Sequence, residues 1–373
     1  MRMSRDRRIA VLMITPSIIL LAIFVYGFIG QTIATSLSDW GTDPNKPALM
    51  PGVLINFVGL KNYQDLFTGL LNARFRGDLV NTVFFTALFL AVCLGLGLLL
   101  AIMLDQNTRG EGIFRTVFLF PMALSFVVTA TVWRWLFQPN GGFNVLPTML
   151  GLDKLNFGWF TDRTTFISFT WQQMFLFVAL LILMAMAYFA VTRWQGRRRT
   201  AAVYFLIGLG LLGGVVLTAA LGLPASVRNE RHGLNVAIIA IVIAAAWQMS
   251  GYTMAMYLAG LRGIPEELRE AARVDGCTEW QVYRYVVLPL MQPITLSAAI
   301  ILGHISLKIF DLVFVMGGGS NQQIDMPSVN MYLTTFQGNN FALGSAIAVI
   351  MLIMVALIII PYLITQLRGE TQL

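Results

Sequence analysis

The chain has 373 residues, of which 57% are hydrophobic and 12% are charged. Soluble globular domains carry about 25% charged residues, so this composition excludes a water-soluble enzyme or binding module and indicates a membrane protein. The net charge of +7 leaves a nucleic-acid partner open until the basic residues are located along the chain.

Eight apolar runs are long enough to cross a bilayer, whose hydrocarbon core needs about 20 mostly apolar residues per helix. They predict an all-α membrane protein with about eight transmembrane helices. Arginines precede the first run, but no small-residue cleavage site follows it, so we interpret it as a retained span. The runs are 9–37, 79–104, 113–138, 166–192, 200–222, 235–261, 288–316 and 341–367.

The basic residues gather on one side of the predicted membrane. If the amino terminus lies inside and the spans alternate, lysine and arginine are denser in the inside segments, as the positive-inside rule expects. The inside turn 193–199 is the most basic of these segments. The distribution predicts a multi-pass protein of the cell membrane, in contact with lipid, with both termini cytoplasmic and no nucleic-acid partner.

The segments predicted outside contain many turn-forming residues. The largest, 38–78, is rich in Pro, Gly and Asn and is expected to be irregular. The last, 317–340, begins with glycines and predicts a turn or a re-entrant dip. The other two outside segments are 139–164 and 223–233.

The inside connection 262–287 carries the start and stop signals of a short helix. Pro265 can occupy the first helical position, and the two glutamates after it suit the positive end of the helix dipole. Gly276 can adopt the left-handed conformation that ends this helix after Asp275.

A second short helix is predicted directly after the first. Thr278 and Gln281 are spaced as a capping pair, and the helix that they open leads to Pro289 at the start of the next span. We therefore expect a compact helix–turn–helix against the cytoplasmic side of the membrane. A plain linker between two spans explains neither the length of the connection nor these paired signals.

The same connection contains a motif of fixed spacing. Glu270, Ala271 and Ala272 are followed after three residues by Gly276, and nine residues later by Val286–Pro289. This pattern resembles the EAA loop of binding-protein-dependent ABC importer permeases.

A wider resemblance covers most of 9–165 and 235–367. These parts look like the carbohydrate-uptake branch of the same family. The residues that carry this likeness are Arg109, Gly110, Phe114, Arg115, Pro121, Trp133, Arg134, Trp135, Gly141, Asn144, Trp247, Gln248, Gly251, the run 258–261, Ile264, Pro265, Phe310, Asp311 and the glycines 317–319.

The chain departs from this family in one segment. Sugar permeases of this kind usually have six spans, and the resemblance stops near Phe166 and resumes near Leu234. We expect a six-span core with an inserted two-span hairpin, which leaves the sidedness of later segments unchanged. The expected parts are 1–165, the hairpin 166–233, and 234–373 with the coupling loop 262–289.

The resemblance implies a transmembrane permease subunit of an ATP-binding-cassette importer. Its implied partners are two ATP-binding subunits, a second and different permease, an extracytoplasmic binding protein, and a sugar or related polyol as solute. The residues that would couple to the ATPase are Glu270, Ala271, Ala272, Asp275, Gly276, Leu288 and Pro289.

The chain lacks the residues for nucleotide chemistry of its own. No Gly-x-x-x-x-Gly-Lys-Ser/Thr phosphate-binding loop occurs in it. Cys93, Cys277, His232 and His304 lack the spacing of a metal site or a catalytic triad. We therefore expect no enzyme activity, no metal and no cofactor in this chain, with ATP and Mg bound by the partner ATPase.

Polar residues within spans are candidates for a solute pathway. A sugar needs amide, hydroxyl and aromatic groups, which Gln248, Tyr252 and Tyr257 offer, although residues at helical spacing also serve packing. Lys308 and Asp311 are three residues apart and are expected to share a helix face. They either line the pathway or form a snorkelling lysine with its counter-ion.

Two other classes of protein were weighed against the importer. An ion-coupled secondary transporter is the alternative function, but it predicts acidic residues near span centres and inverted repeats. A membrane-embedded enzyme predicts a cluster of acids, histidines or a metal motif at an interface. The chain offers mainly Asp311, which lies off-centre in its span, and shows neither an internal repeat nor such a cluster. The sequence does not identify the sugar or the sister permease.

Overall fold

The computed structural model divides the chain into two compact units, each described by itself. One comprises 1–65, 260–310 and 326–373, and the other comprises 66–259 and 311–325. The structure describes residues 5–43, 49, 54–106, 109–162, 164–171, scattered residues between 173 and 227, then 230–317, 319 and 321–370.

The described residues are mostly helical, as expected. Four helices in them are long and apolar enough to cross a membrane, and two bent pairs raise the number to six if each pair is one span. These segments confirm six of the predicted runs as helical. The runs 166–192 and 200–222 lie largely outside the described residues. The four helices are Leu12–Ser36, Leu70–Asp105, Val236–Arg262 and Phe341–Ile360, and the bent pairs are Glu111–Ala123 with Phe126–Leu136 and Glu279–Leu290 with Gln292–Leu307.

The first unit contains both ends of the described chain and the inside connection. Its elements are α1 (Arg5–Leu21), α2 (Phe28–Ser36), the start of α3 (Lys61–Thr68), α12 (Glu266–Val274), α13 (Glu279–Val282), α14 (Leu288–Leu290), α15 (Gln292–Leu307), α17 (Pro327–Tyr332) and α18 (Phe341–Glu370), with π turns at Ala22–Gly27, Tyr283–Val287 and Leu333–Gln337.

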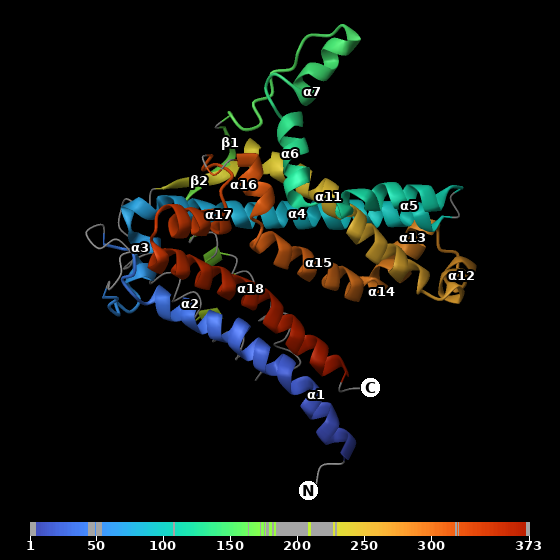
Figure 1. The fold of residues 1–373 in the computed structure, drawn as a ribbon. Coiled ribbons are helices and arrows are strands. Elements are labelled where there is room, and N and C mark those ends of the chain that lie inside the picture. Colours follow the sequence, from blue (N-terminus) through green and yellow to red (C-terminus); the bar gives the residue numbers. More distant parts are fainter. Residues whose placement is uncertain are drawn as a thin grey trace. The chain divides into compact units, whose positions relative to one another are not determined.

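Helices α2 and α18 pack side by side in this unit, although they come from opposite ends of the sequence (Figure 1). The Trp40 ring stacks on Phe341 with a centroid distance of 4.7 Å. The N–H of Ala342 donates to the Trp40 carbonyl at 2.9 Å. The apolar side chains of α1 from Leu12 onward are exposed within this chain, as expected of a helix whose neighbours are lipid.

The second unit is built around α4 and α11. Thr253 on α11 donates a 2.8 Å hydrogen bond to the carbonyl of Cys93 on α4, and a Cβ at Gly97 would overlap the Thr253 side chain. Small residues thus let the two helices approach closely. The elements of the second unit are a 3₁₀ turn at Leu70–Asn72, α4 (Ala73–Asp105), α5 (Glu111–Leu119), a 3₁₀ turn at Phe120–Ala123, α6 (Phe126–Leu136), α7 (Gly142–Val145), a 3₁₀ turn at Leu146–Leu150, β1 (Thr165–Thr170), β2 (Arg231–Asn235), most of α11 (Val236–Arg262) and α16 (Asp311–Gly317).

The fourth predicted run does not begin as a helix. Its first residues belong to β1, which pairs antiparallel with β2. The expectation of an all-α chain, with a span that starts at residue 166, is therefore wrong here. The β1 sequence is rich in β-branched and aromatic residues, which favour strands, and hydrophobicity alone does not separate a strand from the start of a span.

The third predicted run, 113–138, is broken rather than straight, with a 98° bend between α5 and α6. Pro121 lies in the 3₁₀ turn at the break, and Ser125 caps the first turn of α6. The amide of Gln248 donates to the carbonyl of Leu124 at 2.7 Å. A carbonyl released by the break is thereby satisfied within the protein, which membrane depth requires.

The seventh predicted run, 288–316, is also interrupted. Lys308 ends α15 with φ −116° and ψ 14°, and Asp311 begins α16. The two residues do not share a helix face, so that expectation is wrong. The break is stabilised locally, because the hydroxyl of Ser328 donates to the carbonyl of Ile309.

The outside segments contain more regular structure than predicted. Helix α3 lies in 38–78, α7 lies in 139–164, and α17 with its π turn occupies much of 317–340. Asn62 on α3 donates to the carbonyls of Ser36 and Ser38, both at 2.8 Å. Short helices held by such contacts carry too few residues to show a clear hydrophobic period.

Candidate functional site: the inside helix–turn–helix

Helix α12 begins where the sequence predicts a helix. Pro265, which was expected at the first helical position, is instead the capping residue with ψ 132°, so the helix starts one residue later, and Glu266 and Glu267 lie in its first turn. Carboxylates there are favourable because the backbone N–H groups of a first turn lack partners within the helix. The residue order therefore sets the start of α12.

The end of α12 is a Schellman turn at Gly276, whose φ is +85°. The N–H of Gly276 donates to the carbonyl of Arg273, and the N–H of Cys277 donates to the carbonyl of Ala272, both at 3.0 Å. These two bonds define the motif. The stop predicted after Asp275 is confirmed, since Asp275 is the capping residue.

The second predicted helix is present as α13, a π turn and α14. Thr278 and Gln281 form the capping box, with the Thr278 N–H donating to Gln281 Oε1 at 2.7 Å. The π turn ends directly before Leu288 and Pro289. Proline lacks an N–H and crowds the preceding turn, so a widened turn in front of it relieves that conflict.

The EAA residues differ in exposure. Glu270 and Ala271 are exposed, whereas Ala272 is buried at 7% exposure. The sequence hypothesis placed both alanines against a partner, but only Ala271 lies on the surface. Among the described residues no hydrogen bond or ion pair of the Glu270 carboxylate is found, so this charge is available to an external cation.

Several apolar side chains are exposed, as Glu270 is, on the surface of this helix–turn–helix. Val274 is 87% exposed and Trp280 is 68% exposed. Leu268 and Tyr285 are also exposed. Exposed apolar groups around one acidic group are typical of a surface that binds a protein partner.

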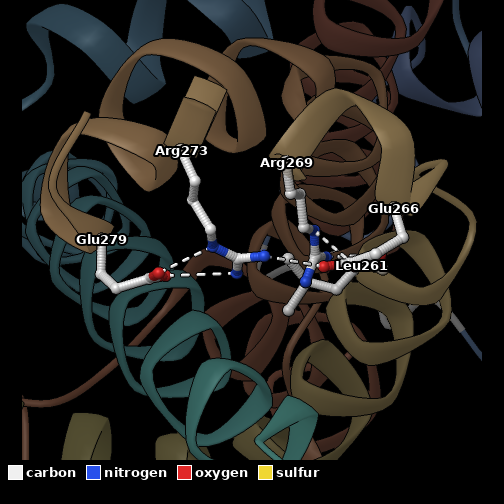
Figure 2. Close-up of polar contacts among 5 residues, drawn as sticks. All are labelled: Leu261, Glu266, Arg269, Arg273 and Glu279. Atoms are coloured by element: carbon white, nitrogen blue, oxygen red, sulfur yellow. Dashed lines mark hydrogen bonds and ion pairs between the residues drawn. The ribbon is translucent and has the colours of Figure 1, made fainter. Parts of the chain in front are cut away.

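Two arginines organise the polar face of the same segment (Figure 2). Arg273 donates from Nε and Nη2 to the two carboxylate oxygens of Glu279, at 2.8 and 3.4 Å, and from Nη1 to Glu266 at 3.0 Å. Arg269 Nη2 donates to the carbonyl of Leu261 at 2.8 Å. Sequence reasoning missed these arginines, although the Glu266–Arg269 and Glu266–Arg273 spacings place them on one helix face.

These contacts shift the titration of the charged groups. Hydrogen bonds from Arg273 lower the pKa of Glu279. The hydrogen bonds to Glu279 and Glu266 raise the pKa of Arg273 above its already high value. Arg273 and Glu279 are therefore both charged at neutral pH.

The predicted pathway residues are placed less favourably for a solute. Gln248 is 2% exposed and Tyr257 is 1% exposed, so both are packed inside the second unit. Tyr252 is half-buried. Lys308 and Asp311 are exposed and lie in different units. Gln248, Tyr252 and Tyr257 all lie on α11, and of these three only Tyr252 has a partly exposed side chain.

A buried charge cluster in the second unit was not predicted. Arg76, at 1% exposure, forms an ion pair with Glu230, with Nε to Oε2 at 2.8 Å. Its Nη1 also donates to the carbonyls of Leu66 and Gly69. His232 Nε2 lies 3.5 Å from the same carboxylate. The residues come from distant parts of the sequence, so no local pattern indicates the cluster.

The environment of this cluster sets its pKa values. Burial alone would raise the pKa of Glu230, but Arg76 and His232 lower it overall. Burial lowers the pKa of His232, against the opposing effect of Glu230. The imidazole also packs edge-on against Trp171, with centroids 5.2 Å apart.

A second ion pair holds the glycine-rich segment after α16. Arg74 at the start of α4 pairs with Asp325 and donates to the carbonyl of Gly319 at 2.9 Å. Asn81 donates to the Asp325 carbonyl at 3.0 Å. Burial raises the pKa of Asp325, and Arg74 opposes that shift. In the described part of the chain no group of three His, Cys, Asp or Glu side chains could hold a metal ion.

Comparison with known proteins decides the family. A family model described as "Binding-protein-dependent transport system inner membrane component" matches residues 205–368. A probable ABC transporter permease protein of Pyrococcus horikoshii is 35% identical over 372 residues, which cover 99% of this chain and 99% of that protein. The chain belongs to this family of ABC importer permeases.

Two further comparisons agree with this assignment. The xylose/arabinose import permease protein XacH of Haloferax volcanii is 30% identical over 355 residues, covering 93% of this chain and 84% of that protein. A bacterial alginate ABC transporter, solved with alginate pentasaccharide-bound periplasmic protein, shares the fold with a TM-score of 0.61 at 18% identity, covering 95% of this chain and 93% of that chain.

Membership of the permease family settles the broad function. The chain is an inner-membrane component of a binding-protein-dependent ABC importer. It is not the catalytic subunit, because ATP hydrolysis belongs to a separate subunit in these systems. Nothing in the comparisons favours an ion-coupled secondary transporter.

Proposed function

We propose that this permease carries a sugar or a related polyol across the cell membrane. The xylose/arabinose permease of Haloferax volcanii supports a sugar, as does the likeness to the carbohydrate branch in the third-span region. The solute is delivered by an extracytoplasmic binding protein, since the family is binding-protein-dependent.

Helix α12 is proposed to be the coupling helix that docks an ATPase on the cytoplasmic face. One observation carries this: the EAA motif lies on a short helix whose Glu270 is exposed and whose surface also presents Val274 and Trp280. Glu270 meets a cation of the ATPase, and Ala271 allows close approach. Asp275 and Gly276 end the helix, while Leu288 and Pro289 join it to the following span.

Two ATP-binding subunits and a second, different permease complete the proposed complex. ATP and Mg are bound by those ATPases and not by this chain. The ATPase can shift the inward–outward equilibrium only by the difference between its affinities for the two conformations. Both termini of this chain are proposed to be cytoplasmic, and the inserted hairpin 166–233 is proposed to be a peripheral addition to the six-span core.

The solute pathway is proposed to pass Gln248 and Tyr252 on α11. Gln248 Oε1 is buried and accepts no hydrogen bond from the described residues, which leaves an acceptor beside the broken third span. Tyr257 is assigned to packing because it is almost fully buried. Lys308 and Asp311 stay candidates for contact with solute or with the binding protein.

Uptake measurements test this function. Cells with and without the gene are given labelled pentoses, disaccharides and polyols, each with a protonophore or with ATP depletion. We expect the gene to be required for accumulation of at least one sugar, with uptake abolished by ATP depletion and resistant to the protonophore. Uptake that survives ATP depletion and fails with the protonophore would contradict the proposal.

A further inference from the structure

We propose that Arg269 and Arg273 form a brace that makes the coupling helix a rigid lever. The brace ties α12 to the end of α11 on one side and to α13 on the other. The inference rests on the proposed function, because a lever matters only if an ATPase moves α12. The two arginines are positioning residues, and they touch neither solute nor nucleotide.

Arg273 closes the turn that separates α12 from α13. The turn itself is held by backbone bonds around Gly276, whose left-handed conformation leaves the direction of α13 to neighbouring contacts. Arg273 adds a two-oxygen contact to Glu279 and a third bond to Glu266. A planar guanidinium fork fixes direction as well as distance.

Arg269 fixes the other end of α12. Its side chain is 11% exposed, and its Nη2 donates to the carbonyl of Leu261 in the last turn of α11. Carbonyls of a last helical turn lack partners within the helix, and cations are favourable there. This bond ties α12 to the last turn of α11 by a side chain as well as by the backbone.

Glu266 joins the two halves of the brace. Its carboxylate accepts from Arg273 at 3.0 Å and lies 3.9 Å from Arg269 Nε. Figure 2 shows the two guanidinium groups beside each other, with Glu279 on one side of them and Glu266 on the other. A displacement of α12 is therefore passed to α11 and, through α13, to α15.

The brace fixes the directions of α12 and α13 and adds little to the stability of the fold. Glu266 and Glu279 are 57% and 64% exposed, and exposed ion pairs contribute little to the free energy of unfolding. Removing one arginine should therefore leave the permease folded and still bound to the ATPase. Coupling of ATP hydrolysis to transport should suffer instead, because α12 can then rotate without moving the spans.

The test measures solute transported per ATP hydrolysed by the purified complex in vesicles. Arg273→Gln and Arg269→Gln are compared with Arg284→Gln, a control at an exposed arginine of the same loop whose guanidinium lies over Tyr285. We expect the ratio to fall roughly fivefold or more in both brace variants, the lower end of usual coupling free energies. The control should keep a ratio near that of the parent. An unchanged ratio in the brace variants would overturn the brace.

Charge exchange separates the brace from a direct ATPase contact. Arg273→Glu and Glu279→Arg each place like charges together, whereas the double variant restores an opposite pair. We expect each single variant to uncouple and the double variant to recover at least half of the parent ratio. A double variant no better than the singles would show that Arg273 acts elsewhere and would overturn the proposal.

Hydrogen exchange at backbone amides tests the brace in variants that accumulate in amounts too small for the transport assay. In the complex, Arg273→Lys keeps the charge but loses the fork, so the amides of residues 277–282 should exchange severalfold faster than in the parent. Equal exchange would overturn the brace.

If the parent permease carries no ATPase, the proposed function fails, whereas normal coupling in brace variants that retain the ATPase defeats only this inference.

Discussion

The N–H of Cys277 donates to the carbonyl of Ala272 at 3.0 Å and so closes α12. This bond forms only if the residue directly before Cys277 takes a left-handed conformation. Gly276 does so, and side chains with a Cβ adopt that region at a cost of about 1–2 kcal/mol. The glycine of the EAA motif is thus explained by backbone geometry.

Gly276→Ala should weaken the turn by about 1 kcal/mol and reduce the amount of ATPase that copurifies with the permease. No atom lies within 4 Å of the added Cβ, so the effect is conformational and not steric. Gly276→Asn should be milder, because asparagine visits the left-handed region more readily.

Gly112→Ala is the control for this substitution, since its Cβ also meets no atom within 4 Å and its φ is ordinary. It should leave ATPase recovery unchanged. Equal recovery with Gly276→Ala and the parent would contradict the role given to the turn.

Gly251→Ala should destabilise the second unit. A Cβ there would overlap the carbonyl oxygen of Phe118, so α11 and the end of α5 would have to separate. Overpacking of this kind costs about 1–3 kcal/mol. The midpoint of thermal unfolding in detergent should fall, while Gly95→Ala, which meets open space on α4, should match the parent. Equal midpoints for both variants would count against the close approach.

Acidification should destabilise the protein through His232. Its folded pKa lies below the ordinary 6.5, so between these values the unfolded chain binds more protons, and stability falls as pH drops below about 6.5. Glu230, whose pKa lies below 4.5, loses its contribution to the free energy of unfolding only as the pH falls below 4.5. Unfolding midpoints at pH 7.5 and 5.0 isolate the histidine.

His232→Asn should flatten the change in midpoint between these two pH values. Gly95→Ala, which changes no titratable group and meets open space, is the control and should keep the parent's dependence. A His232→Asn variant with the parent's full pH dependence would show that other groups cause it.

Arg76→Met should cost about 3–5 kcal/mol, because it leaves Glu230 without its partner in a largely buried setting. Arg76→Met with Glu230→Gln should recover part of this loss, since the uncompensated charge is removed. A double-mutant cycle on the unfolding midpoint measures the coupling. Simple additivity of the two single changes would contradict the ion pair.

Local signals predicted the coupling loop well. The start of α12, its stop at Gly276 and the Thr278–Gln281 box each depend on residues a few positions apart, and the structure has all three. Hydrophobic length predicted six apolar helical segments, because a bilayer imposes one dimension on every run, but it gave no sign of the bends in 113–138 and 288–316 or of the strand at Thr165–Thr170.

Other features depend on residues far apart in the sequence. The strand β1 forms because β2 lies beside it, and the pair Arg76–Glu230 joins positions 154 residues apart. The breaks at Ser125 and Lys308 depend on the hydrogen bonds from Gln248 and Ser328 to nearby carbonyls. No window of the sequence contains both partners of such contacts.

The most direct test of the coupling account is copurification of the tagged permease from native membranes, with Glu270→Arg beside the parent and Asp153→Arg, at an exposed position of the segment 139–164, as the charge-reversal control. The account predicts that the parent and the control recover an ATPase and a second permease, and that Glu270→Arg loses the ATPase while keeping the second permease. Full recovery of the ATPase with Glu270→Arg would contradict it.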